Sequence, residues 1–210
     1  ALVKNMDVQM FCSALCHFAR SQHARIRFEV ARAINILSDI WVPKIQKFNE
    51  TMIPCIIQLV HDDFMPVREN ASDAMVTYVK KIKYEQSYPY IEQYQQTIIF
   101  CFHEHMQMQT NALQLVTVFV SVFDKEDTCQ MLTELMPSIL DQFSQIMKSV
   151  ESDQAFNSQQ SMFITAMINA IGAACRLTLS YSRTASTRSS RTSCGSSSGP
   201  LPCSSRRYSA

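Results

Sequence analysis

Glycine is scarce in this sequence of 210 residues, which contains only three. Gly195 and Gly199 lie in the last twenty residues, so Gly172 is the only glycine in the first 181 positions. Hairpin turns and phosphate-binding loops need a positive φ or a close backbone approach, and glycine is the usual residue for both. The scarcity disfavours β-rich folds and nucleotide-binding loops, and it favours an all-α chain.

Long apolar runs and a secretory signal pattern are also missing. The apolar stretch TIIFCF (97–102) is far too short to cross a bilayer, so we expect no membrane insertion. Five of the eight cysteines lie inside apolar helical runs, where a free thiol behaves as a small hydrophobe: Cys12, Cys16, Cys55, Cys101 and Cys175. Without a signal pattern, these cysteines indicate a reducing compartment.

Catalytic signatures are absent as well. No phosphate loop, HExxH or GxSxG motif occurs. Within CFHEH, Cys101 and His105 share a helical face, but they supply only two metal ligands and have no partner pair with suitable spacing. Cys12 and Cys16 share a face from which His17 points away, so they form no nucleophile–base pair. We therefore expect no catalytic residue, no cofactor and no metal, and a chain that is not an enzyme.

The net charge of +1 conceals two regions. Residues 182–210 contain five arginines and no acid, which leaves the rest of the chain with 14 basic against 18 acidic residues. That body lacks a basic stripe, so we expect no nucleic acid partner. A mildly acidic body can instead meet a basic partner.

An internal repeat appears when the sequence is shifted against itself by 41 residues. IRFEVARAINIL from Ile26 then lies over VRENASDAMVTY from Val67, and Arg27 lies over Arg68. The apolar positions of the preceding helix repeat too, and a third copy follows in phase with Gln109 in place of the arginine. A fourth helix pair, with its first helix beginning near Pro137 and its second ending near Cys175, follows after a longer interval.

Repeats of about forty residues, each a helix pair, are typical of HEAT and armadillo proteins, and paired helices favour HEAT. We predict an α-solenoid of about four HEAT-type antiparallel helix pairs over residues 1–180. The buried alanines Ala71 and Ala74 set a short distance between neighbouring helices. Asp62 and Asp63, in the turn between two helices, are expected to meet Arg27 or Arg68 and form a ladder between repeats.

Residues 181–210 are rich in Ser, Arg, Gly and Pro and cannot bury a core. Three interpretations stay open for this C-terminal tail: a disordered segment, a mis-translated segment that follows a frameshift or a mis-joined exon, or an Arg/Ser interaction tail.

The stretch HARIRFEVARAINILSDIWVPKIQKFNETMIPCIIQLVHD (23–62) resembles the central repeats of the importin-beta (karyopherin-beta) family of HEAT-repeat nuclear transport receptors, especially the importin beta-3 type. YPYIEQYQQTI, MLTELMPSILDQFSQIM and MINAIGAA continue the resemblance in order, so that it covers about residues 8–176. The resemblance implies a fragment of a longer receptor that shuttles between cytoplasm and nucleus. Such a receptor carries protein cargo with basic signals, and it binds the Ran GTPase and nucleoporins through its full-length form.

Cargo contacts in that family lie on the concave, second helices of the repeats. On this sequence a helical wheel places nine residues on that side: Glu29, Arg32, Ile36, Asn70, Asp73, Thr77, Asn111, Gln114 and Val118. Of these, Glu29, Asn70, Asp73 and Asn111 are the candidate partner-binding residues. Thr77, Lys80 and Lys81 stand where the family pattern has acids, which argues against a strong acidic site there. The alternative is a HEAT scaffold or regulatory subunit of another protein complex.

Overall fold

The computed structural model describes residues 7–40, 46–123, 125–150 and 157–192. Within these ranges the regular secondary structure is entirely helical. Contacts divide the chain into two units, Ala1–Cys175 and Arg176–Ala210. The first unit contains the stacked helix pairs, and it carries the argument below.

Each repeat of the first unit consists of a first helix and a second helix. The first helices are α1 (Val8–Phe18), α4 (Asn49–Val60), α7 (Ile91–Phe102) and α9 (Lys125–Val150). The second helices are α2 (Ala24–Ile40), α5 (Met65–Lys81), α8 (Met106–Val122) and α10 (Ser158–Thr192). Short helices η2 (Gln46–Phe48), α6 (Tyr84–Ser87) and η3 (Tyr88–Tyr90) lie between the repeats.

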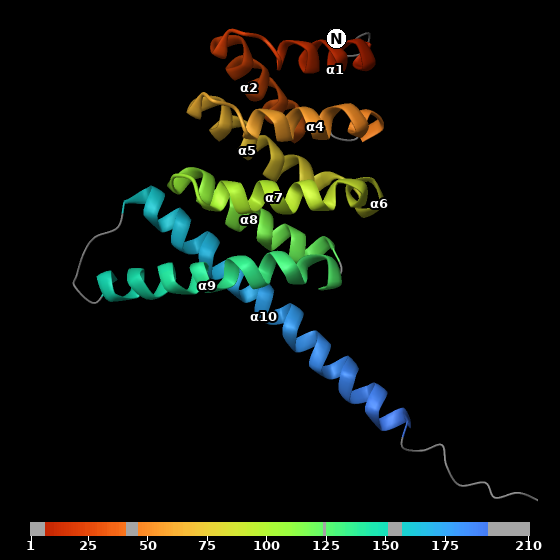
Figure 1. Cartoon of the computed structure of the whole chain (residues 1–210), viewed down its shortest axis with the longest axis vertical. Coiled ribbons are helices and arrows are strands. Elements are labelled where there is room, and N and C mark those ends of the chain that lie inside the picture. Colours follow the sequence, from red (N-terminus) through yellow and green to blue (C-terminus); the bar gives the residue numbers. More distant parts are fainter. Residues whose placement is uncertain (1–6, 41–45, 124, 151–156, 193–210) are drawn as a thin grey trace, which may run out of the picture. The chain divides into compact units, whose positions relative to one another are not determined.

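The first helices form one layer and the second helices form another (Figure 1). Each repeat contacts its neighbour through both layers, since α1 packs on α4, α4 on α7, α2 on α5 and α5 on α8. The prediction of an all-α solenoid built from about four antiparallel helix pairs is confirmed.

Helix α5 shows why the sequence stacks in this way. Pro66 occupies its first turn, where a missing N–H costs no hydrogen bond. Its buried positions follow the helical period, and Ala71 and Ala74 are 1% and 0% exposed. Because these side chains are small, α2 and α8 can both approach α5 closely, and Met75 and Tyr78 fill the space beside them.

The fourth repeat differs from its prediction at the start of its first helix. We expected that helix to begin near Pro137, but α9 begins at Lys125 and holds Pro137 in its interior. The buried residues Met131, Leu135 and Ile139 continue at spacings of four across the proline, so tertiary packing outweighs the local cost of the proline. Helix α4 holds Pro54 in the same way.

The end of α10 also differs from the predicted boundaries. The compact unit ends at Cys175, close to the predicted position 180, but α10 continues as a helix to Thr192, into the predicted tail. No glycine or proline occurs between Gly172 and Gly195, and extending an existing helix costs far less than nucleating one. The rest of the predicted tail, residues 193–210, lies outside the described residues.

One window of α10, Ser158–Thr178, is long and apolar enough to cross a membrane by length and composition. Sequence inspection, which looked for an unbroken apolar run, missed it. Its buried side chains recur at helical spacing, as in the core-facing helix of a repeat: Phe163, Ala166, Met167, Ala170, Ala173 and Ala174.

Candidate partner-binding surface

The nine positions predicted on the outer side of the second helices become progressively less exposed along the chain. Glu29, Arg32 and Ile36 on α2 are exposed, and Asn70, Asp73 and Thr77 on α5 are half-buried. On α8, Gln114 and Val118 are half-buried, whereas Asn111 is only 3% exposed. The surface available to a partner therefore differs from repeat to repeat.

Glu29 is the most accessible of the four candidate residues. Its carboxylate lies 2.9 Å from Arg25 Nη2 and 3.5 Å from Arg32 Nη1, and all three side chains belong to α2. These are exposed pairs one helical turn apart, each contributing about 0.5 kcal/mol or less. A basic partner that reaches Glu29 must compete with two arginines already beside it.

Asn111 is not the exposed contact that the sequence predicts. Its side-chain amide donates hydrogen bonds to Ser72 Oγ at 2.8 Å and to Asp73 Oδ1 at 2.6 Å, so it links α8 to α5. A helical wheel gives the direction of a side chain but not what covers it, and here the neighbouring repeat covers it. We call Ser72, Asp73 and Asn111 the α5–α8 clasp.

Asp73 stands between the clasp and the surface. Burial raises the pKa of its carboxyl above the ordinary value, although hydrogen bonds from Asn111 and Gln107 act in the opposite direction. Its carboxylate is therefore held by the protein and only partly available to a ligand.

Asn70 occupies the same position one repeat before Asn111 but makes a different contact. Its amide donates to the carbonyl oxygen of Pro66 on its own helix at 3.0 Å. A shift of 41 residues places Ala31 and Arg32 where the clasp has Ser72 and Asp73, so no acceptor faces Asn70 from the preceding repeat. Asn70 remains half-buried at the surface.

A hollow of about 450 Å³ lies across α5, α8 and α10, and we call it the second-helix hollow. It is lined by Lys80, Gln114, Thr117, Val118, Ser161, Met162, Thr165, Ala166 and Asn169. Among these described lining residues none is acidic, and Lys80 is the charged one. Apolar and hydroxyl groups with a single cation suit an extended peptide better than a small polar substrate.

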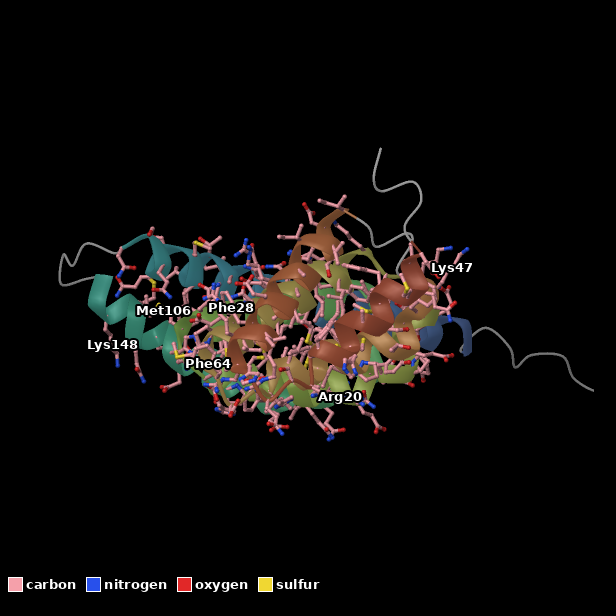
Figure 2. All side chains as sticks on the ribbon, turned by 90° about the horizontal axis from the view of Figure 1, so that it is seen from above. Arg20, Phe28, Lys47, Phe64, Met106 and Lys148 are labelled. Carbon is pink, nitrogen blue, oxygen red and sulfur yellow. The ribbon has the colours of Figure 1, made fainter. Side chains whose placement is uncertain are left out.

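The turns between first and second helices carry the charged residues predicted to form a ladder. Arg27 donates through Nε to Asp62 Oδ2 at 2.6 Å and through Nη2 to Asp62 Oδ1 at 2.9 Å, and it also pairs with Asp63. Its Nη1 donates to the carbonyl oxygens of Ser21 and Gln22 in its own repeat. Figure 2 shows Arg20 and Phe64, which mark the first two of these turns, at one margin of the repeats, and Lys47 at the opposite margin.

Arg68 repeats this arrangement 41 residues later. Its Nη1 donates to the carbonyl oxygens of Asp62 at 3.0 Å and Asp63 at 3.3 Å, and its Nη2 lies 3.2 Å from Glu104 Oε2 in the next repeat. Arg27, Asp62, Asp63, Arg68 and Glu104 together form what we call the inter-repeat ladder. Arg68 thus meets the backbone of Asp62 and Asp63, while their carboxylates turn to Arg27.

Charge and burial make the first step of the ladder the stronger one. The side chains of Arg27 and Asp62 are 13% and 6% exposed, against 18% and 27% for Arg68 and Glu104. Burial alone would raise the pKa of Asp62, but the hydrogen bonds from Arg27 and from the Phe64 N–H outweigh it and lower that pKa. The hydrogen bond to Asp62 in turn raises the pKa of Arg27.

Three inter-repeat contacts escaped the sequence analysis. Glu104 lies 41 residues after Asp63, so the same shift that revealed the repeat could have identified it. His105 Nε2 lies 2.7 Å from Glu69 Oε1, and Lys81 Nζ lies 2.7 Å from Asp39 Oδ1. These two pairs join side chains of different types in single copies, and no repeated signal marks them.

The cysteine and histidine residues of CFHEH face different surroundings. Cys101 is fully buried, and burial raises its pKa to about 12. His105 instead faces Glu69 on α5. Across the described residues, no group of three or more His, Cys, Asp or Glu side chains is placed to hold a metal ion.

A scan against protein-family models finds none that matches the chain. Among solved structures, the chain is similar to Kap121p bound to Ste12p, with a TM-score of 0.64 and 13% sequence identity, over 80% of this chain and 15% of that chain. The karyopherin Kap121p bound to the extreme C-terminus of the protein phosphatase Cdc14p gives a TM-score of 0.63 at 13% identity, over 81% of this chain and 17% of that chain.

A designed armadillo repeat protein gives a TM-score of 0.61 at 14% identity, over 76% of this chain and 63% of that chain. The chain thus spans about 15% of the length of the Kap121p chain in the complex with Ste12p. Such identities establish the fold alone and do not single out the importin beta-3 branch. The chain has a HEAT- or armadillo-like α-solenoid fold of the kind that karyopherins have.

Proposed function

We propose that this chain is a non-enzymatic protein-binding stretch of a nuclear transport receptor. The observation that carries the proposal is the second-helix layer, which presents charged, amide and apolar side chains from successive repeats beside a hollow of about 450 Å³. The likeness to Kap121p, crystallised with protein segments, supports it. Many weak contacts along such a layer can hold one extended peptide.

Glu29, Asn70 and Asp73 are the proposed contacts for the basic signal of a cargo protein. Glu29 offers an exposed carboxylate, Asn70 an amide at the surface, and Asp73 a partly buried carboxylate. Asn111 has an indirect role in this proposal, because it positions Asp73 through the α5–α8 clasp.

The full-length receptor would carry its cargo between cytoplasm and nucleus through nucleoporin contacts and release it when Ran-GTP binds. This part of the proposal rests on the family resemblance of residues 8–176. The importin beta-3 type is the branch that the order of the sequence segments favours.

A second candidate function is a scaffold or regulatory subunit of another protein complex. It is favoured by the second-helix hollow, where Lys80 is the charged lining residue and, among the described residues that line it, no carboxylate is present. A hollow with this lining favours an apolar or acidic segment over a lysine-rich one. The two candidates therefore predict partners of opposite charge.

Fluorescence anisotropy with two labelled peptides separates them, one peptide rich in lysine and the other apolar and acidic. The transport proposal expects the lysine-rich peptide to bind more tightly and Glu29→Lys to weaken it about threefold to tenfold, since a surface charge pair is lost and a like-charge pair replaces it. Glu92→Lys, on the exposed side of α7, is the matched control and should leave binding unchanged.

The full-length receptor should then release the lysine-rich peptide when Ran-GTP is added. Preferential binding of the acidic peptide, abolished by Lys80→Glu, would support the scaffold candidate instead. If the lysine-rich peptide bound no better than the acidic one and Ran-GTP had no effect, the transport proposal would be rejected.

A further inference from the structure

Three thiols meet where the first helices of the first two repeats pack together. Cys12 and Cys16 lie one turn apart on α1, and Cys55 lies on α4. The Cys16 thiol is hydrogen-bonded to the Cys55 thiol, and Cys16 Sγ also lies 3.6 Å from the carbonyl oxygen of Thr51 and 3.9 Å from Met52 Sδ. All three cysteines are free thiols.

The three thiols differ in access. Cys12 and Cys55 are 2% and 5% exposed, whereas Cys16 is half-buried. Cys16 also lines a hollow of about 660 Å³ together with His17, Phe18, Arg20, Ile26 and Thr51, and we call it the α1–α4 hollow. A small reagent that enters this hollow meets the sulfur of Cys16 and not the two buried sulfurs.

The electrostatic surroundings separate the thiols in the same direction. The hydrogen bond from Cys55 lowers the pKa of Cys16, and the positive charge of Arg20 lowers it further against the opposing effect of burial. Burial raises the pKa of Cys12 to about 11, and the hydrogen bond with Cys16 followed by burial raises the pKa of Cys55. The exposed sulfur is therefore the one that the surroundings favour as a thiolate.

We propose that Cys16 is a peroxide-sensitive modification site and that Cys55 resolves its oxidised form into a disulfide joining α1 to α4. The assignment rests on the contact between the two thiols, on the opening of Cys16 into the α1–α4 hollow and on the adjacent Arg20. It does not depend on the proposed transport function.

The chemistry needs one hydrogen peroxide molecule. The Cys16 thiolate attacks one peroxide oxygen, the O–O bond breaks, and the departing hydroxide takes up a proton to become water, which leaves a sulfenic acid on Cys16. The Cys55 sulfur, after losing its proton, then attacks the Cys16 sulfur, and the S–O bond breaks with release of a second water. Two thiols are oxidised by two electrons in total, and the peroxide is reduced to two waters.

The disulfide would join the first helices of two consecutive repeats. Those helices otherwise meet through side-chain packing alone, so the bond would fix the spacing of the first two repeats. Oxidation would then raise the temperature at which this junction unfolds, since a cross-link between distant residues restricts the unfolded chain.

Peptide mapping under non-reducing conditions tests the proposal on the full chain. After treatment with hydrogen peroxide and alkylation of the remaining thiols, we expect a Cys16–Cys55 cross-linked peptide and the loss of two hydrogen atoms per chain. In Cys55→Ser the sulfenic acid of Cys16 should accumulate and be trapped by dimedone. Cys129→Ser, which removes an exposed thiol on α9, is the matched control and should form the same cross-link as the wild type.

A second measurement does not depend on forming the bond. The rate of Cys16 alkylation by iodoacetamide at pH 7 should fall in Arg20→Gln, which keeps an exposed polar side chain at that position and leaves the helical circular dichroism unchanged. Equal alkylation rates for Cys16 and Cys129, a cross-link between Cys12 and Cys16, or cross-links only between separate chains would each overturn the proposal.

Discussion

The guanidinium of Arg27 satisfies two carbonyl groups of its own repeat and binds two carboxylates of the next repeat. Arg68 makes the same backbone contacts 41 residues later and reaches Glu104. A planar group with five donors can bind a turn and a carboxylate together, whereas a lysine could not hold both in a fixed geometry. Each arginine therefore sets the register between two repeats.

Replacing these arginines should produce unequal losses of stability. Arg27→Ala leaves Asp62, whose side chain is 6% exposed, without its cation, and we expect the free energy of unfolding to fall by about 3 kcal/mol. Arg68→Ala removes a more exposed pair and should cost about 1 kcal/mol. Urea denaturation measures both, with the exposed Arg25→Ala, which we expect to change stability by less than about 0.5 kcal/mol, as the control.

The difference between wild type and Arg27→Ala should also depend on pH. The pKa of Asp62 is lowered in the folded protein, so its stabilising contribution is present above the unfolded pKa of about 4 and is lost as the pH falls through the folded value. We expect the two proteins to converge in acid. Equal losses for the two arginines at neutral pH would show that burial of Asp62 does not decide the cost.

At the scale of the helices, the sequence predicted the pairing better than the contacts between pairs. A single shift of 41 residues revealed three copies because the apolar positions and the arginine recur in phase. It also placed Asn70 and Asn111 at equivalent positions, yet one lies at the surface and the other is buried. The difference comes from the facing residues Ser72 and Asp73, which only the packing of α5 against α8 brings to Asn111.

Asn111→Ala should weaken the junction of α5 and α8 through the loss of two hydrogen bonds. The Ser72 hydroxyl and the Asp73 carboxylate would keep their partly buried positions without this donor, and we expect a loss of about 1–3 kcal/mol in the free energy of unfolding. Asn70→Ala, at the equivalent surface position, removes only a bond within α5 and should cost less than about 0.5 kcal/mol. Urea denaturation of the two variants side by side measures the difference.

Asn111→Asp extends this test, since it places a second carboxylate against Asp73. Two carboxylates at one site raise the pKa of at least one of them in the folded protein, so the folded state gains protons as the pH falls. The variant should be less stable than Asn111→Ala at pH 7 and should recover part of that difference toward pH 5. A constant difference over this range would contradict the contact with Asp73.

At the scale of the whole chain, the fourth repeat was the least predictable. Its period is longer than 41 residues, and Pro137 suggested a helix start that the structure places at Lys125. A proline is a local signal, whereas the burial of Met131, Leu135 and Ile139 depends on the neighbouring repeat, which a reading of α9 alone does not contain. The tail was judged by composition, which carries no information on whether a preceding helix continues into it.

Stacked repeats are stabilised by their own helices and by the interfaces with their neighbours, so protection against hydrogen exchange should vary along the chain. Helices α4, α5, α7 and α8 lie between other repeats and contain most of the largest fully buried side chains. The buried side chains of α9 end at Ile139 among its described residues, and Leu140 and Met147 are 47% and 45% exposed. We therefore expect native-state hydrogen exchange to be slowest in α4 to α8 and much faster in α9 beyond Ile139.

This gradient has a direct test in the Arg27→Ala variant. Loss of the first step of the ladder should accelerate exchange in α1 and α2 more than in α7 and α8, because the coupling passes only through nearest neighbours. Mass spectrometry of peptides from each helix, after timed exposure to heavy water, resolves these regions. If exchange instead accelerated equally in all helices, the chain would unfold as one cooperative block, and the ladder would stabilise the whole stack rather than a single junction.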